Sequence, residues 1–273
     1  MIILLKPAEL LYRAVNRVRR ALYRAGILKA RRLPKPVISV GNIAIGGAGK
    51  TPAVIAICRY LEQRGLSVAV LTRGYGGSST GIMTEPDAAR FGDEPVVIKK
   101  RTESTTVIVG SKRYENAQQQ SCDVFVLDDG FQHLQLHRDL DIVIDVPARF
   151  YREGRAALRD ADIVVPRRLE LSVPEELRGR RVFAFSGLAD NEQFFHALAV
   201  EGLKVVGTRQ FADHHRYTER DVAGILAAGA DADAIVTTEK DLVKIRKSEI
   251  MAIPAEFVFD DDVLQRIAAV ARP

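Results

Sequence analysis

Apolar and polar positions along the chain follow two rhythms. Short apolar runs, typical of buried strands, are separated by helix-length segments in which apolar residues recur three or four positions apart. The strand-like runs cover residues 37–40, 67–72, 106–109, 124–127, 142–145, 163–165, 182–185, 204–208, 234–238 and 256–259. Because strands and helices alternate, the pattern predicts an α/β fold with a largely parallel sheet.

The first 36 residues have a pattern of their own, that of an amphipathic helix. One stripe at helical spacing is apolar: Leu11, Val15, Val18, Leu22 and Ala25. A basic stripe lies about 200° round the helix: Arg13, Arg17, Arg20 and Arg24. Such a helix suits a membrane interface with anionic headgroups. The same pattern also fits a helix packed on the body with a solvated basic face.

Length and pattern together divide the chain into three segments. With 273 residues, the chain exceeds the usual size of a single domain. We expect the basic helix at 1–36, a large core at 37–180 and a smaller C-terminal α/β domain at 181–273. The polar, proline-containing stretch 167–181 is the expected hinge. No apolar run approaches the roughly 18–20 residues that a transmembrane helix needs.

The charge is unevenly distributed. The net charge is +5, yet residues 1–36 hold ten basic residues against one acidic residue, so the rest of the chain is mildly acidic. A basic region confined to the leader argues against a nucleic-acid partner and for contact of the leader with an anionic surface. Cys58 and Cys122 are far apart, which excludes a disulfide scaffold and a cysteine zinc site and fits a reducing cytosol.

A glycine-rich segment between the first strand and the next helix carries the first candidate chemistry. It consists of Ala44, Ile45, Gly46, Gly47, Ala48, Gly49, Lys50 and Thr51. Backbone N–H groups in such a turn surround phosphate oxygens, and the helix N-terminus adds positive charge. Lys50 would reach the β- and γ-phosphates of ATP, and the Thr51 hydroxyl would ligate Mg²⁺. The strict motif has glycine where this chain has Ala44, but the segment still predicts a P-loop NTPase fold.

A second candidate site is an acidic strand end. The apolar run 124–127 leads directly into Asp128 and Asp129. Beside a P-loop strand, one such carboxylate can hold the Mg²⁺ shell, and a pair can also polarise a nucleophile. We therefore expect Thr51, Asp128 and Asp129 to form the metal site.

Other P-loop classes fit less well. GTPases read guanine with an [NT]-K-x-D motif, but the segment 238–241 has its lysine one place late. Regulatory ATPases that cycle on membranes carry lysine where this chain has Ile45. A soluble small-molecule kinase or ligase, such as the dethiobiotin synthetase type, would need no basic leader.

Six short motifs occur in one order along the chain. They are Gly41-Asn42, Arg73–Gly76, Gly92–Pro95, Asp128–His133 with Arg138-Asp139, Asp213-His214 with Tyr217, and Thr237–Asp241. Together with the basic leader they resemble the tetraacyldisaccharide 4'-kinase family over nearly the whole chain. That family also lacks the first glycine of the P-loop motif. The resemblance implies transfer of the ATP γ-phosphate to the 4'-hydroxyl of tetraacyldisaccharide 1-phosphate, which gives lipid IVA in lipid A biosynthesis.

The resemblance also implies a cofactor, a substrate and a domain arrangement. The kinase is expected to depend on Mg²⁺ and to act on a lipid. Its core at 37–180 is expected to be a P-loop kinase, with a second domain that closes over the site. It implies a peripheral or monotopic position on the cytoplasmic face of the bacterial inner membrane, held by the N-terminal helix. We expect neither nucleic acid nor an obligate protein partner.

Individual roles follow from the same resemblance. Asp93 resembles the family's catalytic aspartate, and His214 resembles the histidine that pairs with it from the second domain. From the residues alone, Asp93 could also be a turn residue before Pro95, and His214 a polar loop residue beside His215. Contacts with phosphate or acceptor are expected of four residues: Arg73, Gln132, His133 and Glu153. For Gln132 and His133 a structural hydrogen-bonding role fits equally well. Glu153 follows a loop that is shorter than the glycine- and proline-containing loop of the family.

Overall fold

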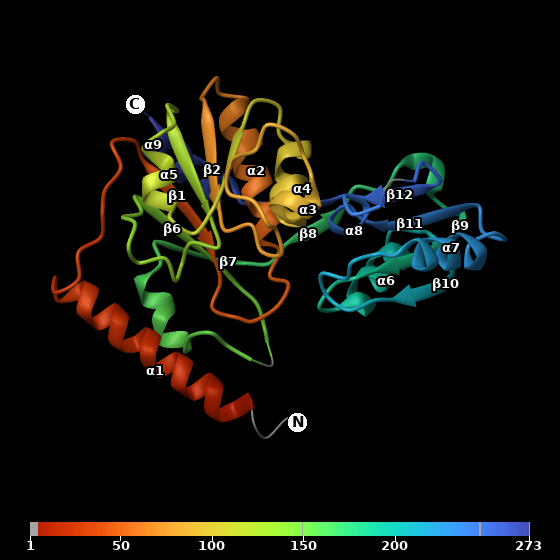
Figure 1. Cartoon of the computed structure of the whole chain (residues 1–273), viewed down its shortest axis with the longest axis horizontal. Helices are drawn as coiled ribbons and strands as arrows, with labels where there is room; N and C mark the ends of the chain where they lie inside the picture. Colours follow the sequence, from red (N-terminus) through yellow and green to blue (C-terminus); the bar gives the residue numbers. More distant parts are fainter. Residues whose placement is uncertain (1–4, 149, 246, 273) are drawn as a thin grey trace.

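Two α/β bodies lie side by side, joined by a narrow connection, and a long helix runs along one side of the larger body (Figure 1). The structure is a computed structural model that describes residues 5–148, 150–245 and 247–272. None of its described helices is both long enough and apolar enough to cross a membrane.

The larger body is built on a seven-stranded sheet. The strand order is β3-β4-β2-β5-β1-β6-β7, and every neighbouring pair is parallel except β3 with β4. The strands are β1 (Val37–Gly41), β2 (Val68–Thr72), β3 (Gly81–Ile82), β4 (Thr106–Val109), β5 (Val124–Asp128), β6 (Leu140–Asp145) and β7 (Ile163–Pro166). The six expected runs of this part are confirmed as strands. The two-residue strand β3 was not expected, because two residues show no periodicity.

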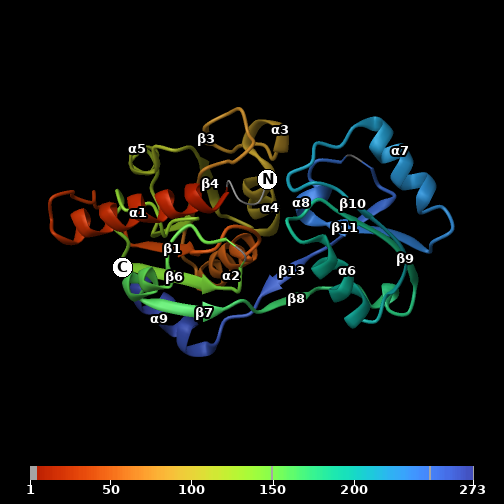
Figure 2. The ribbon, with the colours of Figure 1, turned by 90° about the horizontal axis from the view of Figure 1, so that it is seen from below.

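Helices cover both faces of this sheet. One face packs against α2 (Lys50–Glu62), α4 (Asp93–Arg101) and α9 (Asp261–Ala271). The other face carries α5 (Arg113–Ala117) and the 3₁₀ helix η1 (Arg155–Asp160). Figure 2 shows α1 (Leu5–Arg24) on the same side as α5, opposite α9. The short helix α3 (Ala88–Phe91) comes directly before α4.

The centre of the sheet brings the two predicted nucleotide motifs to one edge. Strand β1 lies between β5 and β6, and in the register with β5 Val40 is opposite Asp128. All five residues of β1 and of β5 are buried. Gly41 ends β1 where a Cβ would lie 2.5 Å from the Cβ of Phe131, so only glycine allows this approach of the two strand ends.

The smaller body is a four-stranded parallel sheet in the order β10-β9-β11-β12. Its strands are β9 (Arg181–Ser186), β10 (Lys204–Gln210), β11 (Ala234–Thr238) and β12 (Ile250–Ile253). Helix α6 (Asn191–Val200) packs on one face and α7 (Glu219–Ala228) on the other. The three expected runs are strands, whereas β12, a short edge strand after a polar stretch, was not expected. The four-residue helix α8 (Glu239–Leu242) follows β11.

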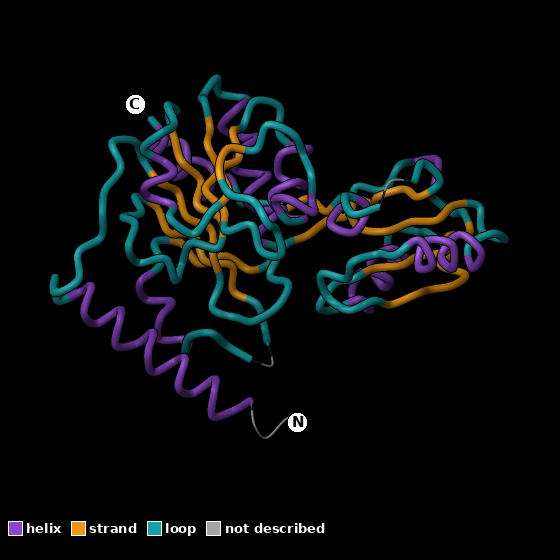
Figure 3. Tube along the Cα trace, viewed as in Figure 1, coloured by secondary structure: helices purple, strands orange, loops and turns teal. Residues whose placement is uncertain are grey.

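Two antiparallel strands connect the bodies. They are β8 (Leu169–Leu171) and β13 (Ala255–Phe257), and η2 (Glu175–Leu177) follows β8 (Figure 3). The expected hinge at 167–181 therefore contains a strand, and the expected strand at 256–259 is only partly one. After β13 the chain returns to the larger body, where Phe257, Phe259 and α9 are buried beside α2. The expected segment 181–273 therefore contains a C-terminal part that packs with the core.

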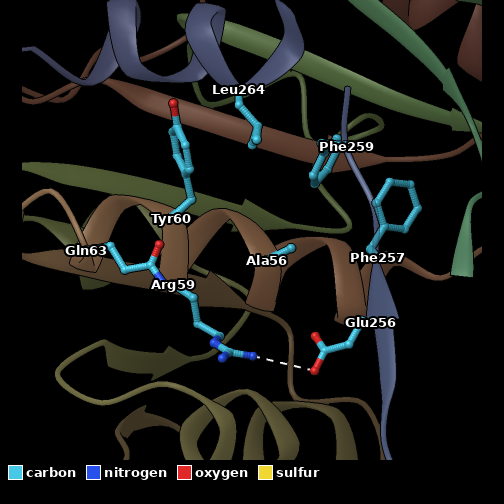
Figure 4. A pocket seen from close by; sticks show the side chains of 8 residues that line it. All are labelled: Ala56, Arg59, Tyr60, Gln63, Glu256, Phe257, Phe259 and Leu264. Atoms are coloured by element: carbon cyan, nitrogen blue, oxygen red, sulfur yellow. Dashed lines mark hydrogen bonds and ion pairs between the residues drawn. The ribbon is translucent and has the colours of Figure 1, made fainter. Parts of the chain in front are cut away.

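This return leaves a pocket of about 230 Å³ between α2, β13 and α9 (Figure 4). Its lining is Ala56, Arg59, Tyr60, Gln63, Glu256, Phe257, Phe259 and Leu264. Arg59 pairs with Glu256 across it at 3.5 Å. The pocket lies along the C-terminal half of α2, whereas the P-loop precedes the N-terminus of that helix.

The face that α1 turns to the body differs from the expectation. Asn16 and Arg20 are buried, while Val15 and Val18 of the apolar stripe are 49 % and 58 % exposed. Arg24 pairs with Asp160 of η1 at 2.5 Å. Val15 and Val18 therefore do not pack on the body, and the basic stripe is not simply solvated, because Arg20 and Arg24 bind acidic residues. Helix α1 ends at Arg24, within the segment 1–36 that was expected to hold the basic helix.

Candidate active site

The P-loop has the geometry of an anion-binding turn. Gly46 (φ 119°) and Gly49 (φ 82°) adopt conformations that favour glycine, and Gly49 caps the N-terminus of α2. Gly46 and Gly47 are exposed, which leaves their backbone N–H groups open to a ligand. The segment before Arg152 runs beside the loop, since the Ile45 N–H donates to the Phe150 carbonyl at 3.0 Å. The segment that was expected to be short for the family thus contacts the P-loop directly.

Lys50 lies among polar partners at the first turn of α2. Its Nζ is 3.3 Å from a carboxylate oxygen of Asp129 and 3.4 Å from Oδ1 of Asn42. Arg152 donates to both oxygens of Asp129, at 2.9 and 3.0 Å. Burial alone would raise the pKa of Asp129, but Lys50 and Arg152 hold this pKa below its usual range. Asp129 has a positive φ of 50°, which turns it away from the strand direction.

Asp128 occupies a different environment one residue earlier. It is 3 % exposed and accepts a hydrogen bond from the Thr72 hydroxyl at 2.8 Å. Burial, the Glu94 carboxylate and the Asp129 carboxylate raise the pKa of Asp128 to about 6. Neighbouring carboxylates repel one another through their like negative charges, and a bound cation relieves this repulsion.

Metal binding here would need oxygen atoms from the ligand. Among the described residues, no group of three or more His, Cys, Asp and Glu side chains could hold a metal ion. Thr51, Asp128 and Asp129 supply one hydroxyl and two carboxylates beside a phosphate-binding loop. This donor set fits Mg²⁺, which is usually held by one or two carboxylates together with phosphate oxygens.

Asp93 and His214 meet across the two bodies. Asp93 begins α4 after Gly92, whereas His214 lies in the loop after β10 with a positive φ of 58°. His214 Nδ1 is 3.0 Å from Oδ2 of Asp93, and Asp93 is 5 % exposed. The hydrogen bond to Asp93 raises the pKa of His214. Burial alone would raise the pKa of Asp93, but His214 and two lysines hold it below its usual range.

The two lysines come from the smaller body, and the sequence analysis assigned neither to the site. Lys240 Nζ is 3.2 Å from Nε2 of His214 and 3.4 Å from Glu94. Lys244 Nζ is 3.7 Å from Asp93 and 3.0 Å from Asp241. Lys240 lies inside the Thr237–Asp241 motif, which could have indicated it. No sequence signal indicated Lys244, because only the short turn after α8 brings it back to Asp93.

The four residues that were expected to contact phosphate or acceptor lie in four separate environments. Arg73 is exposed after β2. Burial and the charges of Arg113 and Arg138 lower the pKa of His133 to about 4, so its ring is neutral at physiological pH. Gln132 donates to the Asn42 carbonyl at 3.0 Å. Glu153 is 3 % exposed and is bound to Arg20 of α1, so the structure places it in a buried ion pair rather than on an open acceptor surface.

Arg113 is a further residue that the sequence analysis missed. It is 5 % exposed and donates to the Asp128 carbonyl at 2.9 Å. Burial lowers its pKa, against the raising effect of the two neighbouring aspartates. An arginine that begins a five-residue helix has no pattern to distinguish it from a solvated one.

This arrangement agrees with what known proteins show. The family model described as tetraacyldisaccharide-1-P 4'-kinase matches residues 1–171 and 164–272. The chain belongs to the tetraacyldisaccharide 4'-kinase family. A curated relative from Pelobacter propionicus is 38 % identical over 89 % of this chain and 82 % of its own, and one from Geobacter sulfurreducens is 39 % identical over 88 % and 82 %. Both are named tetraacyldisaccharide 4'-kinase.

A solved structure supports the fold as well as the family. The apo form of LpxK from Aquifex aeolicus, crystallised in complex with ATP, is 30 % identical and superposes with a TM-score of 0.80 over the whole of both chains. The expected α/β fold of the P-loop NTPase class and the expected membership of this kinase family are confirmed.

Proposed function

We propose that this kinase transfers the γ-phosphate of ATP to the 4'-hydroxyl of tetraacyldisaccharide 1-phosphate and so forms lipid IVA. Membership of the tetraacyldisaccharide 4'-kinase family supports the reaction, and the ATP complex of the Aquifex aeolicus relative supports the phosphate donor. The soluble small-molecule kinase and the membrane-cycling ATPase lack such support.

The P-loop is the proposed triphosphate site. The amides of 46–49 would bind phosphate oxygens, since the Ile45 N–H already donates to Phe150. Lys50 would exchange its contact with Asp129 for the β- and γ-phosphates. Thr51, Asp128 and Asp129 would hold Mg²⁺, which when bound neutralises charge on the phosphates. Arg152 keeps Asp129 ionised and oriented when Lys50 moves to the nucleotide.

The pair of Asp93 and His214 is the proposed proton acceptor for the sugar hydroxyl. A hydroxyl is a poor nucleophile, and a positioned base removes its proton as the phosphoryl group transfers. Because the Lys240 ammonium can only donate, Nε2 of the neutral His214 ring accepts from it, and the ring donates through Nδ1 to Asp93. The Asp93 carboxylate, oriented by His214, is then the group that takes the hydroxyl proton. Since the two residues come from different bodies, the pair forms only when the bodies are close, which limits transfer to water.

Helix α1 is the proposed membrane contact, on the cytoplasmic face of the inner membrane. Val15 and Val18 face away from the body and are available to acyl chains. The headgroup contacts of the basic stripe are restricted to its outward members, because Arg20 is buried. A lipid substrate makes such an attachment useful, since it raises the local substrate concentration.

The single observation that carries the proposal is the contact of Asp93 with His214 beside a complete P-loop. The test is transfer of radiolabelled phosphate from ATP to tetraacyldisaccharide 1-phosphate in detergent micelles. Mild acid hydrolysis of the product then identifies the position of the labelled phosphate. We expect a 4'-phosphorylated product that requires Mg²⁺. ATP hydrolysis without lipid phosphorylation would contradict the assignment.

A further inference from the structure

Arg20 differs from the other arginines of the basic stripe by lying inside the protein. It is 5 % exposed, whereas Arg17 and Arg24 are exposed. Its Nη2 donates to Glu153 at 2.8 Å and to the Phe131 carbonyl at 3.0 Å, and its Nε also donates to Glu153. The guanidinium lies 4.0 Å from the centre of the Phe131 ring. Helix α1 therefore contributes a buried, multiply bonded cation to the larger body.

A chain of hydrogen bonds leads from this cation to the P-loop. Gln132 Nε2 donates both to Glu153 Oε1, at 2.9 Å, and to the Asn42 carbonyl, at 3.0 Å. Asn42 is fully buried, and its side chain donates to the Ala44 carbonyl at 3.0 Å. Oδ1 of the same side chain accepts from Lys50 at 3.4 Å. Arg20 is thus connected to Lys50 through the side chains of Glu153 and Gln132 and then through Asn42, whose backbone carbonyl accepts from Gln132 and whose side chain accepts from Lys50.

A second connection runs through the backbone next to Glu153. Arg152 precedes it and donates to Asp129, the carboxylate that contacts Lys50. The Arg152 N–H donates to the Ile43 carbonyl at 2.7 Å, and the Asn16 amide of α1 donates to the Arg152 carbonyl at 3.4 Å. Residues 152 and 153 are therefore held between α1 and the start of the P-loop.

We propose that Arg20 is a positioning residue of the nucleotide site, so that α1 orders the P-loop in addition to any membrane contact. Without Arg20, Glu153 would keep a buried charge that has lost its principal partner, and it would reorient. This change withdraws the acceptor that aligns Gln132, and with it the support of Asn42 and Lys50. By linkage, ATP binding in turn favours the docked position of α1. This inference rests on the proposed ATP site.

The test compares Arg20→Met with Arg17→Met, an exposed arginine of the same helix. Full-length proteins are studied in detergent micelles, so that recruitment to a bilayer does not limit the reaction. The measurements are the Kd of MgATP by calorimetry, the KM values for ATP and for the lipid disaccharide, and the unfolding midpoint.

For Arg20→Met we expect the Kd and KM of ATP to rise about tenfold, because Lys50 is displaced from its binding position. The lipid KM should change by less than about twofold, since no acceptor contact is lost. Arg17→Met should match the wild type in the Kd and KM of ATP and in the unfolding midpoint.

Glu153→Gln supplies the coupling measurement. If Arg20 acts through Glu153, the double variant Arg20→Met with Glu153→Gln binds ATP no more weakly than the poorer single variant. Multiplied losses would overturn the proposed connection. An unchanged ATP Kd in Arg20→Met, with only a lower unfolding midpoint, would show a purely structural role and would also overturn it.

Arg20→Lys provides the answer if Arg20→Met does not fold. Lysine keeps the charge but lacks the planar fork that binds Glu153 and Phe131 together. We expect a smaller but measurable rise in the ATP Kd, and an unchanged Kd would reject the inference. The proposed function is judged separately: wild-type protein that binds ATP but does not phosphorylate the lipid would fail that proposal and still allow the Arg20 test. Wild-type protein that does not bind ATP would reject both.

Discussion

Lys50 illustrates how a single residue serves both the protein and its ligand. Its ammonium group lies between Asp129 and Asn42, so the P-loop keeps the charge in place by contacts that a triphosphate can replace. The negative charge of Asp129 keeps a positive partner in that exchange because Arg152 remains bound to it. Neighbouring Asp128 differs, since burial and two nearby carboxylates keep its pKa near 6.

Lys50→Ala should abolish kinase activity and leave the fold intact. The side chain is held by the polar partners Asp129 and Asn42 and is not part of the apolar core, so the fold does not depend on it. The charge between the β- and γ-phosphates, however, disappears. We expect kcat to fall well beyond about tenfold, which corresponds to roughly 1.4 kcal/mol. Steady-state kinetics with a parallel unfolding curve measures this. A folded variant with more than a tenth of wild-type kcat would contradict the P-loop assignment.

The contacts of His214 define the direction in which substitutions of its neighbours should shift its pKa. The hydrogen bond to Asp93 raises its pKa, whereas the charge of Lys240 lowers it. Asp93→Asn should therefore lower the pKa of His214, and Lys240→Met should raise it. Ring chemical shifts of the histidines followed by NMR over pH give both values, and His215, which pairs with Asp221, serves as the internal control. Shifts in the same direction for both variants would disprove the arrangement.

Asp93 and His214 should also behave as one catalytic unit. If they accept the proton together, the double alanine variant loses little more kcat than the poorer single variant. Kinetics of the three variants in micelles tests this. Losses that multiply would indicate that His214 acts on another group.

At the scale of secondary structure, α1 shows that amphipathicity alone does not say which face docks. Its buried contacts are polar, through Asn16 and Arg20, and its exposed side chains include Val15 and Val18. Acidic residues of the 153–160 segment supply the matching surface, because Glu153 binds Arg20 and Asp160 binds Arg24. A helix that docks by its basic face keeps its apolar face for another contact.

Val15→Glu with Val18→Glu should release the protein from vesicles that contain anionic lipids. Each valine inserted among acyl chains contributes on the order of 1.5–3 kcal/mol, which the glutamates remove. Flotation of vesicles measures binding, and Val200→Glu, at a valine 71 % exposed on the smaller body, is the matched control. The KM for lipid in vesicles should rise, while the ATP Kd stays the same. Equal flotation of the folded double-glutamate variant and the control would argue against the interfacial role.

At the scale of the whole molecule, helix α4 joins the two bodies at both of its ends. Its first residue, Asp93, meets His214, and its last residue, Arg101, pairs with Glu239 of α8 at 2.6 Å. Arg101 also contacts Glu256 of the connecting strand β13. The side chains of Arg101 and Glu239 are 15 % and 18 % exposed, so water screens this pair less than a surface pair. These contacts set the position of α8, which carries Lys240.

Arg101→Met should lower kcat while the KM for ATP stays within about twofold, because the P-loop is untouched and only the approach of the two bodies weakens. We expect a loss of about three- to tenfold, as for one half-buried ion pair. Glu239→Gln should give a similar loss, and the double variant should not be worse than the poorer single variant. Arg59→Met, which removes the longer and more exposed pair with Glu256, is the control. A rise in the KM for ATP with unchanged kcat would contradict this role.

The amino-acid sequence by itself determined the parts of this protein that depend on neighbours in the chain. Apolar runs predicted the strands of both sheets except the short strands β3 and β12, since strand periodicity is local. The segment 44–51 predicted the P-loop because its turn and helix cap lie within a few residues. Tertiary structure alone decided the rest. The pairs of Lys240 with Glu94 and of Lys244 with Asp93 join segments far apart in sequence. The packing of α9 against α2 and the docking of α1 on Glu153 and Asp160 also depend on residues distant in the chain. Such contacts form only where the fold has already brought separate segments together, so no local pattern records them.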